Sequence, residues 1–334
     1  MMDSLDIDVI ITWVDNEDPE WIQEYVKYAE YEENNLRFED LGTLKYIFRG
    51  IEKFMPWVRK IHFVTCGHYP EWIDLKNPKL NLVNHDEIFP DKHVLPVFNS
   101  CAIEMNLHKI EGLSEKFIYF NDDMFVVQKL DSKYFFTDNL PNDFFIVKSL
   151  FHDNLFSHQL HGDMQVINKE IKEDKSFSRQ IRKVLTLKYG LKSMIKSFLL
   201  MVITKEIPLF ALNHHPQAHL KSNFIEVEEA YKNIIEKTRT SRFRSCEDMN
   251  QYLFRFWGLI KGKYHPYKHN DTLYIGVDNL IEFRNKINKL EYLNPALICF
   301  NEHDGFNPKD YPEYTNILIG YLDSILPQKS LWEI

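Results

Sequence analysis

The first 120 residues alternate short apolar runs with segments whose apolar residues recur at helical spacing. The apolar runs cover residues 7–13, 60–65, 80–83 and 117–120, and the helical segments cover residues 19–29, 41–54 and 100–110. Runs of this length that are rich in β-branched residues are typical of buried strands. Because two neighbouring parallel strands need a crossover between them, strands that alternate with helices favour a parallel sheet. We therefore predict an α/β fold with an open, mostly parallel, Rossmann-like sheet.

Carboxylates follow three of the predicted strands. Asp15 follows the first strand, Asp122 and Asp123 follow residues 117–120, and Glu302 follows a last strand over residues 297–300. In open α/β sheets, ligands bind beyond the carboxyl ends of the strands, where these side chains would converge. Clustered carboxylates suit Mg²⁺ or Mn²⁺ together with a diphosphate. Asp and Asn are also common turn residues, so ordinary turns remain the alternative at this point.

The middle of the chain differs in charge. From Lys175 to Lys205 there are eight Lys and Arg residues and no Asp or Glu, with apolar residues between them. We predict a basic helical insertion over residues 151–212, between an α/β half (1–150) and an α/β completion (213–334). The basic segment is either a solvated helical face or a contact for an anionic membrane surface or a polyanionic acceptor.

Two short basic motifs follow this segment. His214 and His215 precede a proline and so lie in an extended or turn segment. Such a pair is more often structural or exposed, and the functional alternative is a general base for a hydroxyl nucleophile. Arg242 and Arg244 flank Phe243, and guanidinium groups bind phosphate oxygens in a bidentate fork. A surface salt bridge is an equally supported role for these two arginines.

The formal net charge of −9 argues against a nucleic-acid partner, because affinity for the phosphate backbone needs clustered Lys and Arg. The acidic start of the chain has no basic segment followed by an apolar stretch, which predicts that no signal peptide is present. The apolar run over residues 198–203 is far shorter than the roughly 20 residues of a membrane span. Four widely separated cysteines without C-x-x-C spacing fit a reducing cytoplasm.

Taken together, these segments resemble the Stealth family, whose four conserved regions occur here in order. The matching segments are residues 7–15 for the first region, 37–40, 57–61, 84–90, 95–100 and 117–123 for the second, 214–216 and 244–249 for the third, and 294–302 for the fourth. The order of four regions makes the resemblance specific, whereas no single motif would.

The resemblance implies an activity and a fold. Stealth proteins include bacterial capsular-polysaccharide phosphotransferases and the animal enzyme that adds N-acetylglucosamine-1-phosphate to lysosomal glycoproteins. By this resemblance the sheet is glycosyltransferase-A-like, and the reaction transfers a hexose-1-phosphate, expected to be N-acetylhexosamine-1-phosphate, from a UDP-sugar to a hydroxyl. It forms a phosphodiester, releases UMP and uses Mg²⁺ or Mn²⁺. The expected acceptor is an oligo- or polysaccharide in bacterial capsule or cell-wall synthesis.

The resemblance also implies roles for individual residues. The family's catalytic residues map onto Asp123, His214 and Arg244. We expect Arg244 to bind the β-phosphoryl oxygens and His214 to take the acceptor proton, with Asp123 as the rival base. The metal is expected on Asp122, Asp123 or Glu302. The donor pocket is expected to be lined by Asp15, Arg37, Asn99 and Ser100.

One position departs from the family pattern. The fourth region usually reads Asn-Asp, and this chain has Asn301-Glu302, which places the carboxylate on an arm one methylene longer.

Two other functions fit part of the sequence pattern. A metal-dependent glycosyltransferase would release UDP, and a non-enzymatic carbohydrate-binding protein would use the aromatic content of 14%. The basic segment is also compatible with peripheral binding to the inner membrane or to the capsule assembly machinery.

Overall fold

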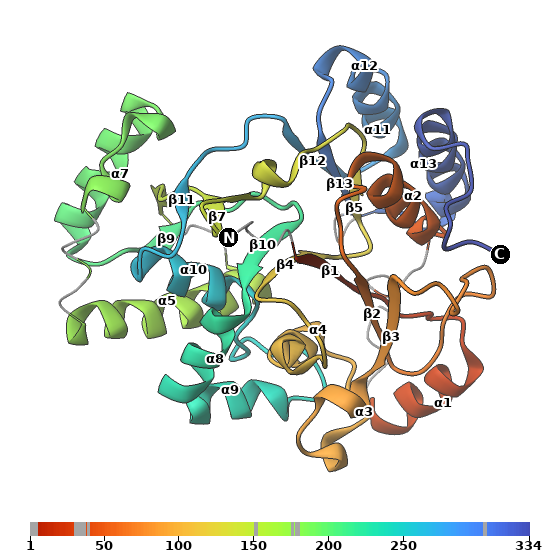
Figure 1. The fold of residues 1–334 in the computed structure, drawn as a ribbon, viewed down its shortest axis with the longest axis horizontal. Helices are drawn as coiled ribbons and strands as arrows, with labels where there is room; N and C mark the ends of the chain where they lie inside the picture. The colour runs from red at the N-terminus through yellow and green to blue at the C-terminus, as the bar shows by residue number, and fades with distance from the viewer. Residues whose placement is uncertain are drawn as a thin grey trace.

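The computed structural model describes residues 6–29, 38, 41–149, 153–174, 177, 181–302 and 306–334. Its centre is a five-stranded sheet in the order β10-β4-β1-β2-β3 (Figure 1). The strands are β1 (Ile7–Thr12), β2 (Ile61–Thr65), β3 (Leu80–Asn84), β4 (Lys116–Phe120) and β10 (Gln217–Leu220). β1 to β4 run parallel, and β10 pairs antiparallel with β4. The predicted open, mostly parallel α/β sheet is confirmed.

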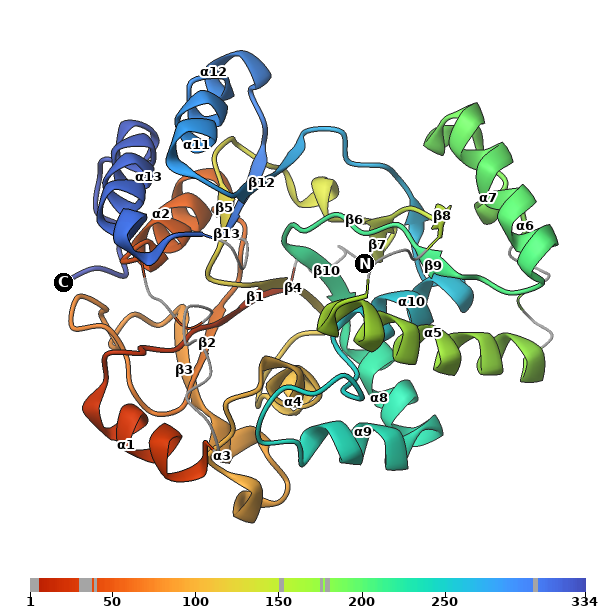
Figure 2. The same cartoon turned by 180° about the vertical axis from the view of Figure 1, so that it is seen from behind.

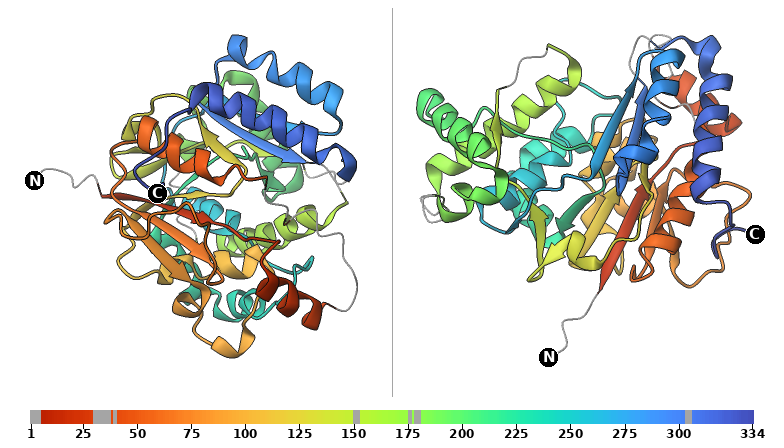
Figure 3. Two further views of the ribbon diagram at one scale, coloured as in Figure 1. Left: turned by 90° about the vertical axis from the view of Figure 1, so that its right-hand side faces the viewer. Right: turned by 90° about the horizontal axis from the view of Figure 1, so that it is seen from above.

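The central sheet is covered on both faces, as buried parallel strands require (Figure 3). In β1, Ile7, Val9 and Ile11 belong to one hydrophobic core and Ile10 belongs to the other. The first core includes residues of α2 (Leu44–Phe54), α11 (Leu280–Ile287), α12 (Leu290–Leu293) and α13 (Tyr311–Ile325). The second core includes residues of α3 (His85–Ile88), α4 (Ser100–Glu104), α5 (Leu155–Glu173), α8 (Lys221–Ala230), α9 (Lys232–Arg239) and α10 (Tyr252–Ile260).

Helix α1 (Pro19–Tyr28) begins where the sequence predicts it. The Asp18 carboxylate accepts a hydrogen bond from the backbone N–H of Trp21 at 2.8 Å, which caps the helix. Trp21 and Tyr25 then pack edge-on against Phe98 in a small aromatic cluster. This contact holds α1 against the loop that leads into α4.

The strand expected over residues 297–300 is present as β13 (Leu297–Glu302), but it lies outside the central sheet. It pairs parallel with β12 (Thr272–Val277) and antiparallel with β5 (Met124–Val126). We expected the three acidic strand ends to meet at one edge of one sheet, and β13 instead belongs to a second sheet. β5 follows Asp123 directly, so the turn after β4 joins the two sheets. Helix α2 packs closely on β5, since a Cβ at Gly50 would lie 2.7 Å from the carbonyl oxygen of Val126.

One predicted helix ends earlier than expected. The helix expected over residues 100–110 ends after Glu104 and is followed by the 3₁₀ turn η3 (Leu107–Lys109). The Asn106 amide donates to the carbonyl oxygen of Ala102 at 3.0 Å, so a side chain takes the acceptor that a continuing helix would use. Helices α8 and α9 follow β10 and are separated at Tyr231.

The remaining elements are short and were not predicted. The strands are β6 (Phe136–Thr137), β7 (Leu140–Asp143), β8 (Val147–Lys148), β9 (Leu209–Phe210) and β11 (His265–Pro266). The 3₁₀ turns are η2 (Lys92–Val94), η4 (Ser132–Tyr134), η6 (Leu187–Tyr189) and η7 (Pro308–Asp310).

The middle of the chain is helical, with α5 followed by α6 (Ile181–Val184) and α7 (Leu191–Thr204). Leu160, Met164 and Ile167 of α5 belong to the second core, together with residues from both flanking α/β ranges. Helix α7 lies at the edge of the molecule, at the opposite end from α13 (Figures 1 and 2). Among the described residues, no helix combines the length and the apolar character needed to cross a bilayer.

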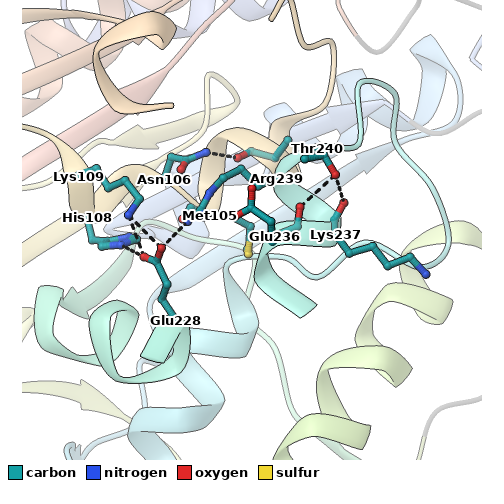
Figure 4. A network of polar contacts seen from close by, with 10 residues as sticks. Met105, Asn106, His108, Lys109, Glu228, Glu236, Lys237, Arg239 and Thr240 are labelled. Carbon is teal, nitrogen blue, oxygen red and sulfur yellow. Dashed lines mark hydrogen bonds and ion pairs between the residues drawn. The ribbon is translucent and has the colours of Figure 1, made fainter. Parts of the chain in front are cut away.

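A partly buried ionic network fastens α8 and α9 to the turn that follows α4 (Figure 4). The Glu228 carboxylate contacts His108 at 2.5 Å and accepts hydrogen bonds from Lys109 and Arg239, each at 3.0 Å. Burial opposes its charge, but these partners lower the pKa of Glu228 to about 2. Arg239 also donates to Glu236 at 2.7 Å. The network holds the helices that precede the Arg244 segment.

Asp8 forms a second buried network near the start of β1, at the sheet edge away from the acidic turn. Its carboxylate accepts hydrogen bonds from Arg59 at 2.8 and 2.5 Å and from the Ser114 N–H at 2.8 Å, and it lies 3.1 Å from His62 Nε2. Burial alone would raise the pKa of Asp8, but these partners lower it from 3.8 to about 2.

We expect Asp8→Asn to reduce the free energy of unfolding by about 3 kcal/mol at pH 7, because Arg59 loses its charged partner. Since the folded-state pKa lies below the unfolded value, the carboxylate stabilises the fold above pH 4 and loses that effect as pH falls toward 2. Urea unfolding between pH 7 and pH 3 should therefore show the gap between wild type and variant narrowing. The exposed Asp86→Asn is the control, and equal unfolding midpoints for Asp8→Asn and wild type at pH 7 would contradict the prediction.

Candidate active site

The turn after β4 places Asp123 at the centre of a cluster drawn from three distant parts of the chain. One oxygen of its carboxylate, Oδ2, lies 3.2 Å from His214 Nε2, 3.1 Å from Cys299 Sγ and 3.3 Å from Asn301 Nδ2. The backbone carbonyl of Asp123 accepts a hydrogen bond from the Phe300 N–H at 3.1 Å. Both the backbone and the side chain of Asp123 are thus fixed by β13.

The second oxygen of this carboxylate is different. Oδ1 of Asp123 is buried and has no hydrogen-bond partner among the described residues. Burial opposes ionisation, but the charge of His214 and hydrogen bonds from His214, Cys299 and Asn301 hold the pKa of Asp123 below its usual value. A charged, buried oxygen without a partner is costly unless a ligand satisfies it. This oxygen is therefore the candidate position for a ligand in the cluster.

His214 lies in the segment that precedes β10, and its ring packs edge-on against Tyr274 of β12, with ring centroids 5.8 Å apart. Burial acts to lower the pKa of His214, but the Asp123 carboxylate outweighs it and holds the pKa above the ordinary 6.5. The carboxylate that orients the ring also stabilises its protonated form, which is the arrangement of a base held by a carboxylate. The neighbouring His215 is buried, and burial lowers its pKa to about 3.

The predicted residues Asn99, Ser100 and Arg244 are brought together by two adjacent strands of chain. Phe98 N–H donates to the Arg242 carbonyl at 2.8 Å, so the segment before α4 runs beside residues 242–244. Arg244 Nη2 then donates to Ser100 Oγ at 2.5 Å. Arg244 is half-buried, so its guanidinium is both held and accessible.

Asn99 is buried and its side chain is used within the protein. Its Oδ1 accepts the Cys101 N–H at 3.0 Å, which caps α4. Its Nδ2 donates to Asp248 Oδ2 at 2.9 Å and to the Ser241 carbonyl at 3.0 Å. Asn99 therefore fixes the loop that carries Arg244.

Glu104 is a buried carboxyl group that interacts electrostatically with residues of both clusters. Burial raises the pKa of Glu104 to about 7, although the Gln251 N–H and the charges of Arg244 and His214 favour its ionised form. Its Oε2 accepts the Gln251 N–H at 2.8 Å, and its Oε1 accepts from Tyr119 of β4 at 3.3 Å. Because both cations act on this one carboxyl group, the Asp123–His214 pair and Arg244 share one electrostatic environment.

The structure shows less about the remaining predicted residues, which are Asp15, Asp122, Arg37 and Glu302. Asp15 lies beyond the end of β1, at the same sheet edge as the turn after β4; its N–H donates to His68 Nε2 and its Oδ1 accepts the Glu17 N–H, both at 2.9 Å. Asp122 is exposed. Arg37 lies outside the described residues. Glu302 ends β13, where it pairs with Val277, and its side chain lies outside the described part of the structure.

No role for Cys299, Asn301 or Glu104 was predicted from the sequence. Alternation along a strand places residues 299 and 301 on one face of β13, and that period of two was a usable signal. Glu104 gave no such signal, because an acidic residue in a short helix is normally exposed.

A metal ion fits this cluster at one position. One donor atom each from Asp123, His214 and Cys299 lies within 4.8 Å of the others. The Cys299 thiol donates a hydrogen bond to Asp123 Oδ2, and His214 contacts the same oxygen. Asp123 Oδ1 is therefore the carboxylate oxygen left to coordinate a hard cation. The residues present therefore fit a divalent cation held by carboxylate oxygen.

Known relatives share this chain almost from end to end. The capsular polysaccharide phosphotransferase WcwK of Streptococcus pneumoniae is 34% identical over 337 residues, which cover 98% of each chain. The receptor polysaccharide phosphotransferase WefC of Streptococcus oralis is 36% identical over 340 residues, covering 98% of this chain and 99% of that one. Residues 37–144 match the Stealth protein CR2, conserved region 2. This chain belongs to the Stealth family.

The predicted family is thus confirmed, and with it the class of the protein: this Stealth protein is an enzyme of the phosphotransferase class. The match to conserved region 2 includes Asn99, Ser100 and Asp123. Among solved structures, a galactosyltransferase, LgtC, in complex with donor and acceptor sugar analogs, aligns over 95% of this chain and 96% of its own, with 11% identity and a TM-score of 0.41.

Proposed function

We propose that this Stealth enzyme transfers a hexose-1-phosphate, specifically N-acetylhexosamine-1-phosphate, from a UDP-sugar to a sugar or polyol hydroxyl in capsule or cell-wall polysaccharide synthesis. The acceptor oxygen bonds to the β-phosphorus, the bond between that phosphorus and the oxygen bridging to the α-phosphate breaks, and UMP leaves. The observation that carries this proposal is the His214–Asp123 pair, with Asp123 Oδ1 unsatisfied, in one electrostatic environment with Arg244.

His214 is the base in this proposal. Its ring is oriented by Asp123 Oδ2, and it takes the hydroxyl proton as the acceptor oxygen attacks. The same carboxylate stabilises the imidazolium that results. Asp123 is the weaker candidate for this role, because its pKa is held below that of an ordinary carboxylate.

Arg244 is proposed to bind the β-phosphoryl oxygens, with Ser100 fixing one end of its guanidinium fork. Ser100, Asp15 and Arg37 are proposed to contact the UDP-sugar, while Asn99 acts by fixing the loop of Arg244. Transfer of a phosphoryl group needs in-line positioning and neutralised oxygens more than covalent help from the protein.

A Mg²⁺ or Mn²⁺ ion is proposed on Asp123 Oδ1, with Asp122 and Glu302 as the other carboxylates. When bound, such an ion neutralises diphosphate charge and stabilises the leaving UMP. We also propose a cytoplasmic enzyme that meets a polysaccharide acceptor, with peripheral contact to the inner membrane or the capsule assembly machinery.

The released nucleotide distinguishes this proposal from its rivals. With a UDP-sugar and an oligosaccharide acceptor, we expect UMP in equal amount to product and a phosphodiester signal in the ³¹P NMR spectrum of the product. Release of UDP with a product free of phosphorus would replace the proposal with a glycosyltransferase. Sugar binding without turnover, unaffected by removal of divalent metal, would indicate a carbohydrate-binding protein.

A further inference from the structure

Helix α7 exposes side chains that helices of folded proteins normally bury. Ser197 is its buried residue, and Ser197 Oγ accepts the Val147 N–H at 2.9 Å, which joins the helix to β8. The exposed apolar side chains are Leu191, Ile195, Phe198, Leu199, Val202 and Ile203, the last with 75% of its surface exposed. A surface helix ordinarily turns its apolar stripe toward the core. In α7 an apolar stripe is instead exposed to solvent.

These residues form one continuous stripe. At 100° per residue, positions 191, 195, 198, 199 and 202 fall within about a third of the helix circumference, on the side opposite Ser197. Ile203 lies at one border of the stripe, on the same side of the helix as Lys192 and Lys196. A single exposed Leu or Ile needs no explanation, whereas an apolar stripe along a whole helix marks an interaction surface.

The charges within α7 are of one sign. Lys192 and Lys196 lie on the helix, which contains no Asp or Glu, and Lys188 and Lys205 flank it. Glu206 follows Lys205, and its carboxylate is paired with Lys172 at 2.6 Å. Within the described part of the chain, no ion pair involves Lys192 or Lys196. The rest of the chain is acidic enough to give a net charge of −9. The basic charge is therefore concentrated where the apolar side chains are exposed.

We propose that α7 lies flat on an anionic lipid surface, with its apolar stripe in the boundary between headgroups and acyl chains and its lysines among the headgroups. Lys residues that border an exposed apolar face are the composition of an interfacial helix. The helix has 14 residues and is about 21 Å long, shorter than the roughly 30 Å hydrocarbon core, so it lies in the interface. Two copies packed stripe to stripe would instead bring like charges together.

The acidic remainder of the protein orients this contact, because an anionic surface repels it while attracting α7. The inference deepens the membrane contact proposed above and does not depend on the proposed reaction, since binding to lipid can be measured without donor or acceptor.

The test is co-sedimentation of the full chain with vesicles of pure phosphatidylcholine or with 30% phosphatidylglycerol added. We expect binding to the anionic vesicles that weakens with salt. Lys192→Glu combined with Lys196→Glu should reduce the partition coefficient at least about 30-fold, and Ile203→Ser about tenfold. Thermal unfolding of each variant checks that the fold is retained.

Two matched controls keep the result specific to α7. Ile281→Ser removes an equally exposed isoleucine, 74% exposed, from α11. Lys76→Glu combined with Lys129→Glu makes the same change in net charge at exposed positions outside α7. Neither control should alter vesicle binding. Equal loss in the controls, or no binding of the wild type to anionic vesicles, would overturn the proposal. A dimer in sedimentation equilibrium that Ile203→Ser dissociates, without vesicle binding, would assign the stripe to self-association instead.

Discussion

Asp123→Asn is expected to reduce kcat at least about 10³-fold, because in the proposed mechanism one side chain serves both the base and the cation. The amide is nearly the same size, but it removes the negative charge that holds the pKa of His214 above 6.5. It also replaces an anionic Oδ1 with a neutral group at a buried position without another partner. Steady-state release of nucleotide measures the loss.

A surface Asp–His pair provides the control for this substitution. Asp153 Oδ1 lies 2.8 Å from His158 Nε2, with both side chains exposed, and Asp153→Asn should leave kcat unchanged. Binding of Mn²⁺ followed by electron paramagnetic resonance should weaken in Asp123→Asn and not in Asp153→Asn. If Asp123→Asn keeps a tenth of wild-type activity, or binds Mn²⁺ as wild type does, Asp123 does not have the proposed role.

His214→Ala is expected to reduce kcat by about 10²–10⁴-fold, the range that a positioned general base supplies. Added imidazole should restore part of the lost rate, because the cavity left beside Asp123 and Tyr274 accepts a ring of the same chemistry. A structural role would not be restored by a soluble base. His158→Ala, which removes an exposed histidine, should change neither kcat nor its response to imidazole. Near wild-type kcat in His214→Ala would assign the base elsewhere.

The four parallel strands could be predicted because each is a short apolar run that must be buried on both faces. Those runs also placed Asp123 after a strand, and the family resemblance gave the candidate residues His214 and Arg244 their expected catalytic roles. The strands that pair with β13 could not be predicted. An apolar run with a period of two indicates a buried strand, but it does not identify the neighbouring strand. The sequence pattern of residues 297–302 is as compatible with the central sheet as with the second sheet, in which the structure places them.

The contacts within the site were less predictable than its residues. An apolar strand offers no sign that Cys299 donates to a carboxylate 176 positions away in sequence. Asn99 looks like a ligand for substrate until its amide is found bonded to Asp248 and Ser241. Such contacts depend on tertiary packing, and local sequence pattern carries no information about them.

The position of β13 has a consequence for how the protein is made. Two of the three donors to Asp123 Oδ2, Cys299 and Asn301, come from this late strand, and helix α13 packs in the same core. During synthesis Asp123 leaves the ribosome long before residue 299, since chains emerge from their N-terminus first. These contacts of Asp123 can form only after residue 301 has been translated, so a polypeptide that stops before β13 lacks two of the three groups that hold this carboxylate.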